Sequence, residues 1–309
     1  MLVLVAGATG NIGQKIVASL LRRGHKVRAL ARSPEKFPAE TLSQLESFVK
    51  ISTYHDIPAL DAAVQGGVDA VICAYNGIPE LQVEGQLFLL RAAERAGVRI
   101  YVSATWNMDW RKQALGDHES YDPYLCFKRL VELTTRMRPH YIFSGVLAEV
   151  LFSAPGRVSF SPQNHGVWDP APDGKRVEIW GDPDVKWQWT SEADAAEFAA
   201  AIVEQKDAAE GGFWTVCSGY DSLPDIARIY EKVRETSVGV ERVGTVEELR
   251  EKAFSGRAAS HPTTMWDYLG YFYVLYTVDG TWTPGPFDNE KLGVKGVGLE
   301  RYLRENPEI

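Results

Sequence analysis

The sequence predicts an α/β fold in which a doubly wound parallel sheet, covered by helices on both faces, carries a smaller C-terminal lobe. Three observations lead to this prediction. The chain opens with a short apolar run, residues 2–6, that breaks into three glycines spaced three residues apart. Apolar strand candidates then alternate with amphipathic helix candidates up to residue 145. The chain then changes character, and residues 145–189 are rich in proline, glycine and tryptophan instead.

The opening segment predicts a nucleotide-phosphate site. Its uniformly apolar run is typical of a central strand covered on both faces. Gly7 allows a tight turn, Gly10 leaves backbone bare where a pyrophosphate would touch it, and Gly13 lets the next helix pack closely. Free N–H groups at the start of that helix, over residues 14–23, favour an anion. The expected cofactor-binding residues here are Gly7, Thr9, Gly10, Asn11, Ile12 and Gly13. The alternative is a glycine-rich corner without a ligand.

The end of the second strand, over residues 25–32, indicates which dinucleotide binds. An acidic residue there would hold the adenosine 2′-hydroxyl of NAD, whereas an arginine pairs with the 2′-phosphate of NADP. Arg32 and Ser33 stand at this position, and the first carboxylate is Glu35. We therefore expect NADPH or NADP as the cofactor. The alternative for Arg32 is a solvated arginine at a strand end.

Composition narrows the class of protein. The net charge is −8 at pH 7, which offers no basic stripe for nucleic acid. Three scattered cysteines are typical of reduced, buried thiols, and His118, His165 and His261 have no partners at metal-ligand spacing. No stretch approaches the roughly 20 apolar residues of a membrane helix. We expect a cytoplasmic monomer or homodimer that binds no metal, nucleic acid or membrane.

The order of elements supports the predicted fold. Strands are expected over residues 45–51, 68–74, 98–104 and 140–144, and helices over 57–64, 81–96 and 123–137. Later in the chain we expect strands over 176–180 and 213–217 and helices over 191–205, 222–235 and 246–253. Residues 1–150 would form the NADP-binding domain and 151–309 mostly the substrate-binding lobe, with segments near 186–218 returning to the core.

Candidate reactive residues follow the fourth and fifth strands. Ala74, Tyr75 and Asn76 end the fourth strand, where open α/β sheets place their ligands, so we expect them to contact the cofactor. Tyr124 and Lys128 lie four residues apart and therefore share one helix face.

These side chains suggest an acid–base site. A tyrosine pKa of about 10 is too high for efficient proton transfer at neutral pH, and a neighbouring ammonium would lower it. Lys128 would also hold the nicotinamide ribose, and Ser103, at the end of the fifth strand, would polarise a substrate carbonyl or imine. The alternatives are a core tyrosine, a solvated lysine and a strand-end serine.

Four motifs together resemble the NmrA-like and isoflavone-reductase-like branch of atypical short-chain dehydrogenases/reductases. They are Gly7-Ala-Thr-Gly-Asn-Ile-Gly13, Val27-Arg-Ala-Leu-Ala-Arg32, Gly67-Val-Asp-Ala-Val-Ile72 and Lys128-Arg-Leu-Val-Glu132. The resemblance implies an NADPH-binding Rossmann domain with a smaller lobe over the cleft. It also implies that Lys128 is catalytic, whereas Tyr124 matches only by its spacing. Ser52-Thr53 departs from the Gly-Asp that relatives usually carry near the adenine.

Two further residues are candidates for a substrate pocket. Glu149 follows the sixth strand, in a part that often borders the nicotinamide in this family, and a plain loop glutamate is the alternative. The chain has nine tryptophans, several of them in expected loops or in the lobe. They could line an apolar pocket for a flat, multi-ring substrate or pack in the core. Trp106, just past the fifth strand, is the preferred pocket residue.

The sequence therefore predicts an NADPH-dependent reductase. It would transfer hydride to a C=O, C=N or activated C=C bond of an aromatic or polycyclic small molecule, within secondary metabolism. One alternative is a redox-sensing regulator that binds NADP without turnover. Another is a redox-neutral cyclase or isomerase that keeps the nucleotide as a structural element.

Overall fold

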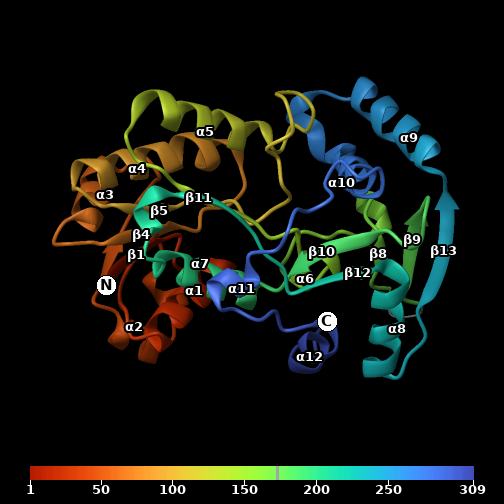
Figure 1. The fold of residues 1–309 in the computed structure, drawn as a ribbon, viewed down its shortest axis with the longest axis horizontal. Coiled ribbons are helices and arrows are strands. Elements are labelled where there is room, and N and C mark those ends of the chain that lie inside the picture. The colour runs from red at the N-terminus through yellow and green to blue at the C-terminus, as the bar shows by residue number, and fades with distance from the viewer. Residues whose placement is uncertain (172–173) are drawn as a thin grey trace.

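A seven-stranded parallel sheet forms the middle layer of the larger part of the molecule (Figure 1). The computed structural model describes residues 1–171 and 174–309. The strand order of the sheet is β11-β6-β5-β4-β1-β2-β3. The strands are β1 (Leu2–Ala6), β2 (Lys26–Ala31), β3 (Ser47–Lys50), β4 (Ala70–Cys73), β5 (Ile100–Val102), β6 (His140–Phe143) and β11 (Gly212–Thr215). Because β1 pairs with β2 on one side and β4 on the other, the strand order reverses beside it. Ligands bind at such a switch point in open α/β sheets.

Helices cover both faces of this sheet. One face carries α1 (Asn11–Arg22) and α7 (Glu192–Val203), and the other carries α3 (Ile57–Val64), α4 (Gln86–Arg95) and α5 (Asp122–Thr134). In β1, Val3 and Val5 pack in the core on the α1 side, whereas Leu4 and Ala6 pack on the α3 side. Burial on both faces is the reason that the opening run is uniformly apolar.

The chain beyond β6 builds two smaller three-stranded sheets and the helices packed on them (Figure 1). Their strands are β7 (Val146–Leu147), β8 (Trp168–Asp169), β9 (Arg176–Trp180), β10 (Lys186–Thr190), β12 (Gly219–Ser222) and β13 (Gly239–Gly244). The helices packed on them are α6 (Ala148–Leu151), α8 (Leu223–Arg234), α9 (Val246–Ala259), α10 (Leu269–Val278) and α12 (Leu299–Glu305), whereas α11 (Asn289–Leu292) packs beside α7 of the central fold. We call this part the lobe. Within the described ranges, no helix is long and apolar enough to cross a membrane.

The predicted α/β fold is confirmed, and several boundaries differ from the predicted ones. Helix α1 begins at Asn11 instead of residue 14, because the chain turns into the helix directly after Gly10. The first turn of the helix expected over 81–96 is π-helical, over Leu81–Gly85. Helix α9 continues to Ala259, six residues beyond the predicted end. Short helices that the sequence did not indicate include α6, α11, α12, α2 (Ala39–Gln44) and the turns Pro34–Lys36, Pro162–Asn164, Ala208–Glu210 and Pro262–Asp267.

Helices α1 and α7 run parallel beneath the sheet. Near their starts, Lys15 of α1 pairs with Glu192 of α7 at 2.6 Å, and near their ends Arg23 pairs with Glu204 at 2.6 Å. Both N-termini therefore lie at the same edge of the sheet, the edge at which β1 ends.

Candidate cofactor-binding and active site

The turn after β1 is closed by backbone contacts that admit no side chain. Gly7 has φ of +76°, and a Cβ there would lie 2.4 Å from the Ala74 carbonyl oxygen. A Cβ on Gly13 would lie 2.2 Å from the Gly7 carbonyl oxygen. Gly10 differs, because a Cβ there would meet only the Gly7 oxygen, at 3.2 Å. The outer side of Gly10 therefore exposes bare backbone that a ligand can approach.

The start of α1 is built to receive an anion. Gly10 precedes the helix in an extended conformation, and no side chain within the described ranges caps it. The N–H groups of Asn11 and Ile12 thus lie in the uncapped first turn, at the positive end of the helix dipole. A bare glycine turn beside uncapped N–H groups suits the pyrophosphate of a dinucleotide. These residues fit the expected NADPH cofactor.

The end of β2 presents the residues predicted to recognise the 2′-phosphate. Arg32 is exposed directly after Ala31, the last residue of the strand. The nearby Glu35 carboxylate is held locally, since its own backbone N–H and the Ser33 hydroxyl donate to it and lower its pKa. Arg32 therefore stays available for an anion, while Glu35 is turned toward its own short helix.

The chain after β4 lies beside the glycine turn. Ala74 N–H donates to the Ala6 carbonyl oxygen at 2.7 Å, which ties the two strand ends together. Asn76 Oδ1 accepts a 2.6 Å hydrogen bond from Gly77 N–H. The Tyr75 hydroxyl is buried and has no hydrogen-bond partner within the described residues.

Tyr124 faces the Asn76-Gly77 turn from the first part of α5. A Cβ placed on Gly77 would lie 3.6 Å from the Tyr124 hydroxyl oxygen. Burial and the neighbouring Tyr273 raise the pKa of Tyr124 well above its usual value, although a hydrogen bond with Asn107 opposes the rise. The expectation that Lys128 lowers this pKa is wrong, because the interior environment dominates.

Lys128 lies one turn further along α5, at the surface. Its ammonium pairs with Glu132, four residues on, and its side chain is 32% exposed. The helix therefore brings Tyr124 and Lys128 onto neighbouring positions as the spacing predicted, but only the tyrosine is enclosed by the core.

Ser103 lies inside the sheet. Its side chain is fully buried, and its hydroxyl donates to the His140 carbonyl oxygen at 2.9 Å. The Ser103 N–H donates to the same oxygen at 3.0 Å. This hydroxyl is thus engaged in joining β5 to β6.

Trp106, the residue predicted to line the pocket, has a buried indole N–H without a hydrogen-bond partner among the described residues. Its ring packs against the cores on both faces of the central sheet. Since a buried indole N–H normally finds an acceptor, Trp106 can donate to a ligand at this end of β5.

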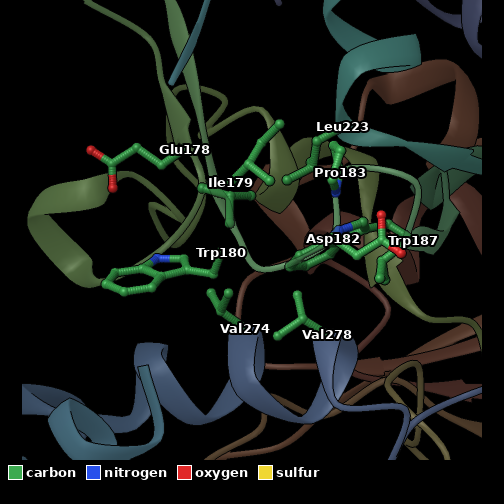
Figure 2. A pocket seen from close by; sticks show the side chains of 11 residues that line it. Glu178, Ile179, Trp180, Asp182, Pro183, Trp187, Leu223, Val274 and Val278 are labelled. Carbon is green, nitrogen blue, oxygen red and sulfur yellow. The ribbon is translucent and has the colours of Figure 1, made fainter. Parts of the chain in front are cut away.

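Most of the other tryptophans pack in cores, which is the second of the two alternatives that the sequence left open. The buried ones are Trp110, Trp168, Trp180, Trp187, Trp189, Trp214 and Trp282. Trp180 and Trp187 border a cavity in the lobe, drawn in Figure 2, whose volume is only about 10 Å³. That is the space of about one water molecule, too small for an aromatic substrate.

Glu149 belongs to α6, and its buried carboxylate lies at the start of α7. Both of its carboxylate oxygens accept from the Glu192 N–H, at 3.0 and 3.1 Å. Burial and the neighbouring Glu192 carboxylate raise the pKa of Glu149 to about 7. The residue predicted as a pocket group thus caps a helix of the central fold.

Two residues that the sequence did not indicate lie close to this site. Asn107 lies beside Tyr124 and lowers the pKa of its hydroxyl, and its position in a polar loop after β5 could have drawn attention to it. Arg157 comes from the lobe and borders the same cleft as Asn11, a cleft of about 380 Å³. Nothing in the local sequence around Arg157 predicts this placement, because it depends on how the lobe packs.

Comparisons with known proteins identify the family. The sequence model of the NmrA-like family matches residues 1–283. The chain is 30% identical over 215 residues to a bifunctional pinoresinol-lariciresinol reductase of Linum perenne, a match that covers 65% of each chain. It is 24% identical over 287 residues to pinoresinol reductase 2 of Arabidopsis thaliana, covering 89% of this chain and 85% of that protein. The chain thus spans slightly under two thirds of the first relative and most of the second.

Solved structures share the fold over the whole chain. A crystal structure of isoflavone reductase aligns with a TM-score of 0.73 at 18% identity, covering 98% of both chains. The structure of AtPrR2 with NADP+ and (+)pinoresinol aligns with a TM-score of 0.72 at 20% identity, covering 98% of this chain and 97% of that one. The family match extends from the glycine turn through the central sheet and most of the lobe. This chain belongs to the NmrA-like family.

Proposed function

We propose that this protein is an NADPH-dependent reductase of aromatic or polycyclic small molecules. The observation that carries the proposal is the bare glycine turn and uncapped helix start at the switch point of the sheet, with Arg32 exposed at the end of the neighbouring strand. The similar pinoresinol reductases and isoflavone reductase, by their names, act on aromatic compounds.

The cofactor would lie along the ends of the central strands. Its pyrophosphate would bind at Gly10, Asn11 and Ile12, and its 2′-phosphate at Arg32 and Ser33. The nicotinamide half would extend past Ala74, Tyr75 and Asn76 toward α5. NADPH would supply the hydride.

The reactive side chains would be Tyr124 and Lys128. Burial keeps the Tyr124 hydroxyl protonated, so it would donate a hydrogen bond, and then a proton, to the atom that gains negative charge. Lys128 would release Glu132 and hold the ribose hydroxyls. Trp106 would border the substrate with its unsatisfied indole N–H. The Ser103 hydroxyl keeps its bond to His140 in this proposal.

Nucleotide titration tests the proposal first. Binding should increase the nicotinamide fluorescence of NADPH and quench the tryptophan fluorescence of the protein. The same titration with NADH provides the comparison. We expect micromolar NADPH binding, much weaker NADH binding, and loss of this preference in Arg32→Ala. Failure of the wild-type protein to bind either nucleotide would overturn the proposal.

A substrate screen then separates an enzyme from a regulator. NADPH oxidation is followed with pinoresinol and isoflavones, the compounds named for the similar proteins. Turnover of any of them supports a reductase. Tight NADPH binding without turnover of these or other aromatic carbonyl and imine compounds would favour the nucleotide-sensing regulator.

A further inference from the structure

Arg157, in the lobe, lies against the start of α1. With the Asn11 amide oriented to satisfy both groups, its oxygen accepts from Nη1 of Arg157 at 3.2 Å. Arg157 also borders the cleft of about 380 Å³ that Asn11, Gln14 and Lys15 line on the α1 side. A cationic side chain from the lobe is therefore in contact with the first residue of the phosphate-binding helix.

Arg157 is held in this position by a buried carboxylate. Its Nε and Nη2 donate to the two carboxylate oxygens of Glu192, at 2.6 and 2.8 Å. The Glu192 side chain is only 2% exposed and also pairs with Lys15. This two-point bond fixes the plane of the guanidinium, and it leaves Nη1 on the Asn11 side.

The charged groups around Arg157 carry a net positive charge, which favours an anion. Lys15 and Arg157 are two cations, and Glu192 is one ionised carboxylate, since their hydrogen bonds outweigh burial and lower its pKa. The second carboxyl, Glu149, has a pKa raised to about 7 by burial and by Glu192. Positive charge therefore remains in excess beside the uncapped N–H groups of α1, where an anion is already favoured.

We propose that Arg157 binds the cofactor pyrophosphate from the lobe side, opposite the N–H groups of α1. The Asn11 amide would move aside, and Nη1 would donate to a phosphate oxygen while Glu192 keeps the guanidinium in place. Arg157 would thus make nucleotide binding depend on the position of the lobe. This inference rests on the proposed NADPH-binding function and adds a phosphate ligand that the glycine turn does not supply.

The alternative is that Arg157 only fastens the lobe to α7 through Glu192. Three variants separate the two roles: Arg157→Gln, Glu192→Gln and the double variant. A phosphate ligand is lost in Arg157→Gln but freed in Glu192→Gln, whereas a fastening ion pair is broken equally in both. Arg176→Gln is the matched control, because Arg176 also pairs with carboxylates of the lobe, Asp169 and Glu178, away from this cleft.

The measurement is the Kd of NADPH by nicotinamide fluorescence, and that of adenosine 2′-phosphate by competition. Adenosine 2′-phosphate keeps the group that Arg32 would bind and lacks the pyrophosphate. We expect Arg157→Gln to weaken NADPH about tenfold, the size of one charge-assisted contact, and adenosine 2′-phosphate less than about twofold. Glu192→Gln keeps one oxygen to hold the guanidinium and removes a negative charge beside the phosphate, so it should bind NADPH at least as well as wild type. Arg176→Gln should bind NADPH like wild type, and the double variant should resemble Arg157→Gln.

Several results would overturn the inference. They are unchanged NADPH affinity in Arg157→Gln, equal weakening of both ligands by that variant, and equal weakening of NADPH by Arg157→Gln and Glu192→Gln. Thermal unfolding without nucleotide checks folding. If Arg157→Gln is unfolded, the double variant, which leaves no carboxylate unpaired, is compared with Glu192→Gln instead. Wild-type protein that binds neither ligand would overturn the proposed function as well, whereas failure confined to the variants would overturn only the role of Arg157.

Discussion

Tyr124 and Lys128 illustrate how two side chains on one helix face acquire different chemistry. They are one turn apart on α5, yet Tyr124 is buried against the sheet and Lys128 reaches the surface, where Glu132 binds it. The environment, more than the spacing, sets the protonation state of the phenol. In the proposed reaction Tyr124 therefore acts as a proton donor, and Lys128 acts through its ammonium on the nucleotide.

Replacement of Lys128 by alanine should reduce turnover far more than stability. The lysine is part of an exposed ion pair, so its loss should change the free energy of unfolding by less than about 0.5 kcal/mol. We expect the reduction rate on an identified substrate to fall at least about 100-fold. Glu132→Gln is the control, because it breaks the same ion pair and keeps the amine. Equal rates for Lys128→Ala and wild type would refute the catalytic role.

At the scale of elements, two parallel helices begin at the same edge of the sheet. The start of α1 is left uncapped, whereas the start of α7 is capped by the Ser191 side chain and by the Glu149 carboxylate. Both starts attract negative charge, but only α1 leaves its N–H groups for a ligand. The capping pattern thus distinguishes a binding helix from a structural one.

Replacement of Gly10 by alanine should separate binding from folding. Gly10 has φ of −78°, which alanine adopts readily, and the new Cβ would meet only one backbone oxygen, at 3.2 Å. We expect a stability loss of about 1 kcal/mol or less and at least a tenfold rise in the Kd of NADPH. Gly285→Ala, where a Cβ has nothing within 4 Å, is the control for added methyl volume. Unchanged NADPH affinity in Gly10→Ala would place the pyrophosphate elsewhere.

The cap of α7 should make stability depend on pH. The folded-state pKa of Glu149 is raised by burial to about 7, above its usual 4.5, so between these values the folded protein binds more protons than the unfolded chain. Glu149 therefore reduces stability as pH rises from 4.5 toward 7. Glu149→Gln keeps one oxygen for the Glu192 N–H and removes the charge. We expect it to gain roughly 1–3 kcal/mol over wild type at pH 8 and little near pH 4.5.

Chemical denaturation at several pH values measures this difference. Glu210→Gln, which replaces an exposed carboxylate, controls for the change in net charge. A Glu149→Gln variant whose stability parallels that of wild type at every pH would refute the assignment of the pH dependence to this cap.

At the scale of the whole molecule, the chain enters the lobe and returns to the central sheet. Strand β10 belongs to a lobe sheet, α7 then packs beside α1, and β11 pairs in parallel with β6 at the sheet edge. Asp288, far later in the chain, accepts from the Thr215 N–H of β11 at 2.9 Å. The chain therefore passes between the lobe and the central sheet more than once, and later segments complete the central fold.

This shared construction predicts a single cooperative unfolding transition. Calorimetric and van't Hoff enthalpies should agree, and tryptophan fluorescence and far-ultraviolet circular dichroism should give one midpoint. NADPH at 100 times its Kd should stabilise the protein by about 2.7 kcal/mol and raise that midpoint without splitting the transition. Two resolved transitions would show that the lobe unfolds independently.

The sequence alone determined the central fold and the glycine turn. A buried parallel strand requires a continuous apolar run, and the turn requires glycines at fixed positions, so both leave local patterns in the chain. The tertiary structure alone decided which side chains face the site. Ser103 and Glu149 form hydrogen bonds inside the protein, most tryptophans are buried in its cores, and Arg157 contacts α1 from a distant segment. Burial and pairing depend on contacts between residues far apart in sequence, which no local pattern records.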